Sequence, residues 1–306
     1  MSEQGKLKYK SLNLVWLSKT SLANLNAGEG SSNIVELKTY SSGQKPYVSG
    51  QAMRHALRAA LERSNHGVIL CTPEAPCGNI AECWLCDLFG FLNPKEGEGS
   101  DRRWSPIKMS PALGQIRNEI VTDLLTRSSE MLKDSGTKDQ RMAYIQLAEN
   151  VYKLGLALDI ENIGRTEKPK IVEKTVQEII KEDHYDINEK KRRIRELIKS
   201  IWNISDLAKQ ARNLASLSPE FIIGTLQSHY NHRLQDAIEM DDDGNIDCER
   251  LKTILIDFKD DNTEIYIGYI SSVVKNDDEL KKTLEDLEIQ VTSPGQVKKD
   301  LLEKFN

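Results

Sequence analysis

The sequence predicts an α+β fold in which helices pack on a sheet. The 306 residues include 39% hydrophobic and 29% charged residues, enough for a core and a charged surface in one elaborated domain or two modest ones. Strand patterns are few and widely separated by long insertions, which disfavours a regular parallel α/β array. No apolar run reaches the ~18 residues of a membrane span and no secretion signal is present, so we expect a cytoplasmic protein.

The strands are predicted from alternating apolar and polar residues. Residues 8–17 place Leu12, Leu14 and Trp16 on one side, as in a half-buried strand. The clearest alternation, at 151–160, predicts a core strand. Shorter patterns predict strands at 104–109, 221–226 and 264–270.

The clearest helical pattern runs from about Gly50 to Arg63, with Ser49 as its N-cap. Its apolar face comprises Met53, Ala56, Leu57, Ala60 and Leu61. The opposite face carries Gln51, Arg54 and Arg58, beside a helix N-terminus whose free N–H groups attract phosphate. Further helices are predicted at 170–182, 188–203, 205–217, 247–256, 277–288 and 294–304, the last capped by Ser293 with Pro294 at its first position.

Charge and loop composition divide the chain unevenly. Residues 1–60 hold eight Lys or Arg against three Asp or Glu, whereas 236–306 hold nine against 19. A basic N-terminal part is compatible with polyanion binding, and an acidic C-terminal part with a solvated face or a basic neighbour. The Gly-, Ser- and Asn-rich segment 23–33 predicts a mobile or ligand-ordered loop within 20–50, and 95–103 predicts a charged loop tip.

Four of the five cysteines fall within 16 residues, in a C-x5-C-x5-C-x2-C pattern of Cys71, Cys77, Cys83 and Cys86. Thiolates are soft ligands in a reducing compartment, so a structural zinc site is the leading prediction. Buried reduced thiols and redox chemistry remain as alternatives. Cys248 stands apart.

Other polar motifs carry weaker signals. The run from Asp241 to Asp247 predicts an acidic turn, because a calcium loop centred on Gly244 would place Arg250 where a glutamate is needed. His229 and His232 are three apart without an accompanying carboxylate or cysteine pattern, so a metal site is disfavoured. No catalytic signature is present.

Five segments resemble, in their order, the backbone subunit of type I CRISPR surveillance complexes: YVSGQAMRHALRAAL at 47–61, CDLFGFL at 86–92, RRWSPIKMSPA at 102–112, KLGLALDIENIGR at 153–165 and AKQARNLASLSPEFIIG at 208–224. The cysteines before the L-F-G are similar to those of the type I-B branch, the DevR-like family of autoregulators within the RAMP superfamily.

This resemblance implies a single elaborated palm domain over 1–306 with an RNA-recognition-motif-like (ferredoxin-like) fold. The palm would carry a cysteine-rich insert at 71–100, a thumb hairpin at 112–142 and a helical insert at 166–204. Copies would assemble head to tail into a helical filament along a crRNA, with other Cascade subunits, and present bases to target DNA in antiviral defence. The resemblance implies no nuclease activity.

A subunit that accepts any guide should hold sugar and phosphate and leave the base edges free. The RNA-binding residues that the resemblance implies are Asn24, Asn26, Lys45, Ser49, Gln51, Arg54, Arg58, Arg102, Arg103, Lys108, Gln210 and Arg212. The basic run Lys190, Lys191, Arg192, Arg193 and Arg195 is expected either to meet target DNA or to form a solvated helix face. The acidic residues Asp241 to Asp243 are expected to dock on the next subunit.

Two alternatives stay open. Type III cousins of this family cut target RNA with a loop aspartate, so a type III-like RNA endonuclease using Asp101 or a nearby aspartate is one. The other is a transcriptional autoregulator that binds duplex DNA, for which no helix-turn-helix pattern is present.

Overall fold

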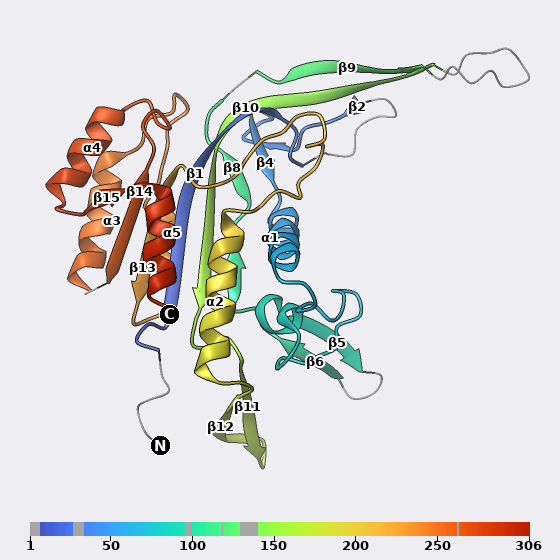
Figure 1. Cartoon of the computed structure of the whole chain (residues 1–306), viewed down its shortest axis with the longest axis vertical. Helices are drawn as coiled ribbons and strands as arrows, with labels where there is room; N and C mark the ends of the chain where they lie inside the picture. The colour runs from blue at the N-terminus through green and yellow to red at the C-terminus, as the bar shows by residue number, and fades with distance from the viewer. Residues whose placement is uncertain (1–6, 27–33, 96–98, 118, 129–139, 262) are drawn as a thin grey trace, which may run out of the picture.

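The computed structural model describes residues 7–26, 34–95, 99–117, 119–128, 140–261 and 263–306. These residues form a mixed α+β structure around a large, mostly antiparallel sheet, which confirms the predicted fold class (Figure 1). Within the described ranges, no helix combines the length and apolar character needed to cross a membrane.

The sheet is built around β1 (Ser11–Ala23), which pairs antiparallel with β10 (Gln140–Asp159) on one side and β13 (Phe221–Gln227) on the other. The full strand order is β15 (Val291–Thr292), β14 (Glu264–Tyr269), β13, β1, β10, β8 (Ala112–Gly114), β4 (Lys45–Val48) and β3 (Thr39–Tyr40). Two further strands, β7 (Ile107–Met109) and β2 (Ile34–Val35), also pair with β10. The strands predicted near 151–160, 221–226 and 264–270 are confirmed.

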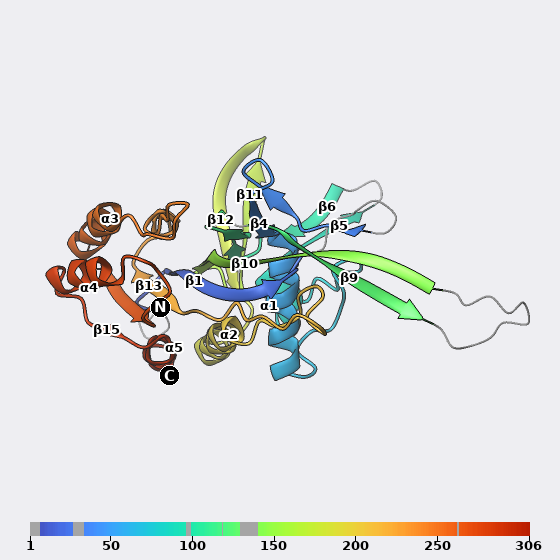
Figure 2. The same cartoon turned by 90° about the horizontal axis from the view of Figure 1, so that it is seen from above.

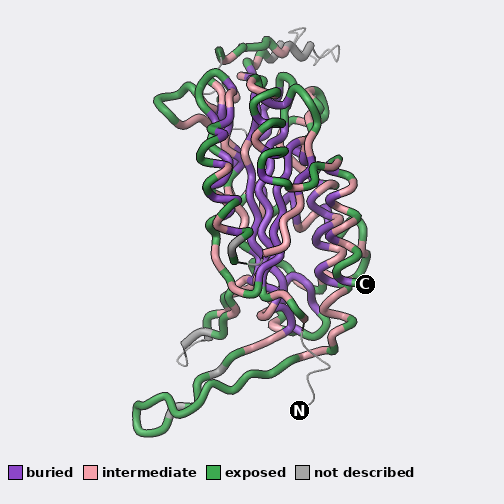
Figure 3. Tube along the Cα trace, turned by 90° about the vertical axis from the view of Figure 1, so that its left-hand side faces the viewer, coloured by how far each residue is buried: buried purple, intermediate pink, exposed green. Residues whose placement is uncertain are grey.

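The prediction that β1 is half-buried is wrong, because both of its faces are covered. Leu12, Leu14 and Trp16 belong to one hydrophobic core, and Val15 and Leu17 to a second core on the other face. Figure 3 shows the resulting buried strands at the centre of the molecule. On the second face Ser11 and Asn13 are also buried, and the Ser11 hydroxyl and the Asn13 amide donate hydrogen bonds inside the protein, so these polar residues do not signal solvent.

The two cores are closed by different helices. On one face lie α1 (Gly50–Ser64), α2 (Ile187–Ile201) and α5 (Pro294–Glu303), whose apolar residues join the Leu12 side of β1. On the other face lie α3 (Cys248–Asp260) and α4 (Asp277–Asp286). The predicted apolar face of α1 is buried in full, and Ser49 and Ser293 cap α1 and α5 as expected.

Three hairpins extend from this body (Figures 1 and 2). The first pairs β9 (Val121–Ser128) with residues 140–147 of β10, so the hairpin extends past the end of the range predicted for a thumb, 112–142. Residues 129–139 lie outside the described residues. The second pairs β5 (Phe91–Lys95) with β6 (Gly99–Arg103). The third pairs β11 (Arg165–Val172) with β12 (Thr175–Asp183).

The helix predicted at 170–182 is wrong, because these residues form most of the β11–β12 hairpin. Branched residues such as Val172, Val176 and Ile179 favour strands. The two-residue turn is made by Glu173 and Lys174, both with positive φ (49° and 66°), as hairpin turns of this type require. No Asn-Gly or Asp-Gly pair marks the turn in the sequence.

The helix predicted at 205–217 is also wrong, because this segment consists of turns and irregular backbone. Lys209 has a positive φ of 58°, which interrupts a right-handed helix. Leu214 is 81% exposed whereas Leu217 is buried, so the apolar residues do not line up on one packed face. Of the loop expected at 20–50, residues 27–33 lie outside the described residues, and 34–48 form the short strands β2, β3 and β4.

Candidate nucleic-acid interface and cysteine cluster

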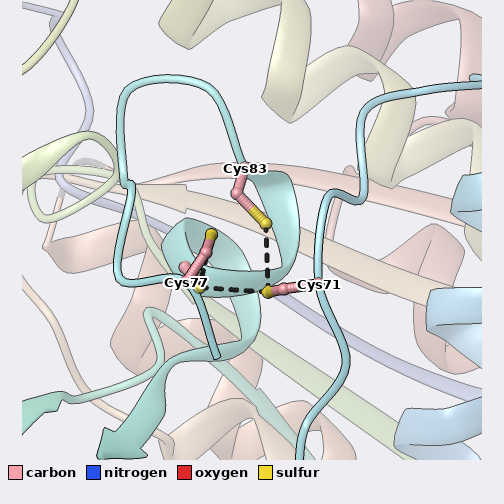
Figure 4. Close-up of side chains that lie close together, drawn as sticks. Cys71, Cys77 and Cys83 are labelled. Atoms are coloured by element: carbon pink, nitrogen blue, oxygen red, sulfur yellow. Dashed lines mark hydrogen bonds between the residues drawn. The ribbon is translucent and has the colours of Figure 1, made fainter. Parts of the chain in front are cut away.

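The four clustered cysteines meet beside the short helical turn η2 (Leu85–Phe89). The sulfur of Cys71 lies 3.5 Å from those of Cys83 and Cys86, and the sulfur of Cys77 lies 3.7 Å from that of Cys86. All four sulfurs are within 4.8 Å of one another. Figure 4 shows Cys71, Cys77 and Cys83 gathered between the loop and the adjacent helical turn. The cluster could therefore hold a metal ion.

The surroundings of the four sulfurs are unequal. Burial disfavours the thiolate of Cys83, but hydrogen bonds from the backbone N–H groups of Cys86 and Leu70 outweigh burial and lower its pKa. Burial raises the pKa of Cys71 and that of Cys86. Backbone donors aimed at a sulfur stabilise negative charge there, as a metal-binding thiolate needs.

Next to this cluster, Asp87 of η2 is the centre of a buried ionic network. Its carboxylate accepts hydrogen bonds from Arg103 (2.5 Å), Arg193 (2.8 Å), Tyr185 (2.5 Å) and the N–H of Gly164 (2.9 Å). Asp87 is completely buried, and the side chains of Arg103 and Arg193 are only 6% and 1% exposed. The network joins the cysteine-rich insert to β6, to the turn after β10 and to α2.

This network changes the assignment of two predicted nucleic-acid contacts. Arg103 also donates to the carbonyls of Asp87, Asn162 and Arg165, so its guanidinium is occupied inside the protein. The suggestion that Arg193 meets target DNA is wrong, because its side chain is buried against Asp87 and Glu189. The basic run on α2 is thus not one continuous charged surface.

The residues predicted on α1 have diverse surroundings. Arg54 donates to the carbonyls of Phe89 and Ile107, both at 2.9 Å, and burial lowers its pKa. Ser49 accepts from the N–H of Ala52 as the helix N-cap. The side chain of Gln51 is exposed, while Arg58 contacts His55. Of this set, Gln51 and Arg58 remain available to a ligand, and the RNA contacts of all four residues stay predictions.

Two predicted loop segments lie side by side. The N–H of Ala208 donates to the carbonyl of Leu25, which brings the loop containing Gln210 and Arg212 against the loop containing Asn24 and Asn26. Asn24 is buried, and its amide donates to the carbonyls of Glu36 and Gln146. The carbonyl oxygen of Asn24 and the amide nitrogen of Asn26 are buried without a hydrogen-bond partner.

Lys45, in β4, forms an ion pair of 2.5 Å with Asp242 and its side chain is only 13% exposed. Asp242 also pairs with Arg117 at 2.6 Å, and hydrogen bonding from Lys45 lowers the pKa of the Asp242 carboxyl. The acidic run from Asp241 to Asp247 forms a turn around Gly244, as predicted. One of its carboxylates thus neutralises a lysine that the sequence assigned to RNA.

A groove of about 740 Å³ opens between the β5–β6 and β11–β12 hairpins, at the end of β10. Its walls include three residues predicted from the sequence, Arg102, Arg103 and Lys108, together with Asp101. They also include residues that the sequence analysis missed, of which the aromatic ones are Phe91, Trp104, His184 and Tyr230. The feature of the sequence that could have indicated these aromatic groove residues is the tryptophan directly after Arg102 and Arg103.

The remaining predicted residues lie away from this groove. Gln210 donates to the carbonyl of Ala215, and the side chain of Arg212 is exposed without a hydrogen-bond or ionic partner in the described part of the chain. His229 and His232 lie in irregular backbone, and among the described residues the cysteine cluster is the group that could hold a metal ion.

These features define a mixed α+β protein with a four-cysteine cluster, projecting hairpins and a groove lined by cations and aromatic rings. The profile of the family "CRISPR-associated negative auto-regulator DevR/Csa2" matches residues 71–242, more than half of the chain. The protein belongs to this family, as the sequence motifs indicated.

Solved structures share the fold along nearly the whole chain. A chain of a "CRISPR RNA-guided surveillance complex" has a TM-score of 0.58 at 13% identity, covering 96% of this chain and 98% of that chain. A chain of a "CRISPR RNA-guided surveillance complex, pre-nicking" has a TM-score of 0.60 at 9% identity, covering 97% of this chain and 100% of that chain. No curated protein matches the sequence.

Proposed function

We propose that the protein is the backbone subunit of a Cascade-type CRISPR surveillance complex, which polymerises along crRNA and acts without catalysis. The carrying observation is its membership of the DevR/Csa2 family. End-to-end likeness to chains of surveillance complexes supports the same role. The subunit holds the guide by its sugar-phosphate backbone and leaves the bases free to pair with target DNA.

The strand order supports a palm with an RNA-recognition-motif-like fold. The strands β13, β1 and β10 are adjacent and antiparallel, and β7 and β8 pair with the far edge of β10. The helix α1 follows β1, and α2 follows β10, both on the same face of the sheet. This is the β-α-β-β-α-β sequence of ferredoxin-like folds, with the fourth strand beside the first.

The β9–β10 hairpin is the proposed thumb, which contacts a second copy of the chain. Exposed apolar side chains follow it on both strands, including Val121, Leu124, Met142 and Tyr144. Apolar surface on a projecting hairpin favours burial against a partner. The head-to-tail assembly that we propose rests on this surface and on the family. We expect it to form in the cytoplasm, together with other Cascade subunits.

We further propose zinc as the ion of the cysteine cluster. Four sulfurs at about 2.3 Å from a tetrahedral zinc ion lie about 3.8 Å apart. Three of the sulfur pairs are 3.5–3.7 Å apart, and all four sulfurs lie within 4.8 Å of one another. The ion would tie Cys71 and Cys77 to η2 and stabilise the insert beside Asp87. Its role is structural, because four protein thiolates leave no open coordination position.

The proposal is tested by co-expressing the chain with a crRNA and measuring the protein-to-RNA ratio and particle length. Binding should weaken as salt rises, with each phosphate contact contributing about 0.7 to the log–log slope. Charge reversal of Arg102 and Lys108 should weaken binding. Reversal of two exposed lysines elsewhere, Lys282 and Lys299, serves as the matched control. A monomer without affinity for crRNA at low salt would contradict the proposal.

Two further measurements separate the alternatives. Incubating assembled particles with complementary RNA and Mg²⁺ tests the endonuclease, since Asp101 lines the groove. Regularly spaced cuts that disappear in Asp101→Asn would replace the non-catalytic role. Tight binding of duplex DNA by the chain without crRNA would favour a transcriptional autoregulator.

A further inference from the structure

The groove between the β5–β6 and β11–β12 hairpins contains an unusually exposed aromatic ring. Trp104 is 75% exposed, whereas Trp16 and Trp84 are 0% and 2% exposed. It follows β6 directly and lies on the groove wall together with Tyr230, which is 39% exposed. Large rings left in water indicate a binding surface when they lie in a concave site.

The groove also contains two cations that have no ionic partner among the described residues. The guanidinium of Arg102 lies 5.7 Å from the ring centroid of Trp104, and the side chain of Lys108 is exposed. Neither forms an ion pair or side-chain hydrogen bond within the described ranges. By contrast, Arg103 and Arg165 on the same wall are held by Asp87 and Asp183.

The three carboxylates that line the groove differ in their partners. Asp159 accepts two hydrogen bonds from Asn162, and Glu167 pairs with Lys181. Among the described charges on the wall, Arg102, Lys108 and Asp101 remain without a hydrogen-bond or ionic partner. Arg102 and Lys108 can therefore bind anionic groups, although the carboxylates of Asp101 and Asp159 lie on the same wall without an ionic partner among the described residues. The ring favours a flat ligand.

We propose that Trp104 is a stacking platform for one unpaired nucleobase, with Arg102 and Lys108 binding the flanking phosphates. The inference rests on the proposed function and assigns to it a base-contacting site. A ring stacks on any base, so the platform adds affinity without selecting a sequence. Such a site suits a base that has left the paired segment, either of the guide RNA or of a DNA strand.

The affinity test compares a short oligouridine with an oligonucleotide of the same length and backbone that lacks bases. Stacking requires bases, whereas phosphate contacts do not. Trp104→Ala should weaken oligouridine binding about tenfold, within the range known for stacking on aromatic residues, and leave the abasic affinity unchanged. Trp104→Phe should remain within about twofold because a phenyl ring also stacks.

Loss of the two cations should affect binding differently from loss of the ring, because phosphate contacts do not depend on bases. Replacing both Arg102 and Lys108 by alanine should weaken binding of both oligonucleotides and reduce the salt slope by about 1.4. Ile256→Ala is the matched control, since Ile256 is 41% exposed on α3 and does not line the groove. Repeating the comparison with the DNA analogue, thymidine oligonucleotides, distinguishes guide from DNA as the source of the base.

Tryptophan fluorescence provides an independent measurement, because the ring of Trp104 is the most accessible among those described. Oligouridine should quench the wild-type signal, and Trp104→Phe should abolish the quenching. Equal affinities of wild type and Trp104→Ala for RNA and DNA would overturn the platform while leaving crRNA assembly by the same variant, and hence the proposed function, intact. Loss of assembly at unchanged oligonucleotide affinity would instead make the groove a docking site for protein, and would also overturn the platform.

Discussion

Replacing Asp87 by asparagine should destabilise the fold strongly, because it removes the negative charge that balances two buried arginines. The side chains of Arg193 and Arg103 are 1% and 6% exposed, and Asp87 is completely buried. Removing one partner of a buried ion pair typically costs about 3–5 kcal/mol, since the remaining charge is left unpaired. For a chain of this size the cost corresponds to a fall in Tm of roughly 6–15 °C.

The matched control is Asp206→Asn, which also removes a carboxylate bound to an arginine. Asp206 and Arg63 are 36% and 58% exposed, so this change should cost at most about 1 kcal/mol. Urea and thermal unfolding followed by circular dichroism measure both variants. If Asp87→Asn unfolds at the same urea concentration as Asp206→Asn, the buried network does not hold the cysteine-rich insert to α2.

Three further changes test separate parts of the molecule. Cys83→Ser should lower the Tm and reduce bound zinc to below half an equivalent, as measured by elemental analysis. A chelator should then have little further effect on the Tm of this variant. If a chelator leaves the Tm of the wild type unchanged, the cysteines are reduced thiols. Burial raises the pKa of Glu264, but hydrogen bonds from Lys304, Lys8 and Tyr9 outweigh burial and lower it far below 4.5. A carboxyl whose pKa is lowered by folding stabilises the fold at pH values above its unfolded pKa, and this stabilisation is lost as the pH falls. Glu264→Gln should therefore make the fall in Tm below about pH 4.5 less steep. If the Tm of this variant falls with pH as steeply as that of the wild type, Glu264 does not cause the fall. Asp242→Asn frees Lys45 and Arg117 and should strengthen crRNA binding while steepening the salt slope by up to about 1.4; weaker binding with a lower Tm would show that the pair is structural.

Local signals were sufficient for many of the elements. The helix α1 was predictable because its apolar spacing and its cap both lie within one short segment, and β10 because its alternation is long. The helix predicted at 170–182 failed because charged residues at mixed spacing mimic an exposed helix, while the hairpin depends on the backbone of Glu173 and Lys174. The family motifs were informative, since four of the five segments lie wholly or partly within residues 71–242, which the family profile matches.

The candidate sites were likewise predictable only where the residues involved are close in the sequence. The cysteine spacing predicted a cluster, and the four sulfurs do converge. Sequence alone could not separate Arg102, which has no ionic partner among the described residues, from the adjacent Arg103, whose charge is buried against Asp87. It also missed Trp104, because exposure of a ring is not visible in a pattern of residue types.

The amino-acid sequence by itself determined the α+β class, the capped helices, the cysteine cluster and the family, since these depend on residues close in the chain or on motif order. Only the tertiary structure decided which cations can reach a ligand. Arg103 and Arg193 meet Asp87 across 16 and 106 positions of sequence. Whether a charge is free depends on such distant partners, because an ion pair forms wherever folding brings opposite charges together.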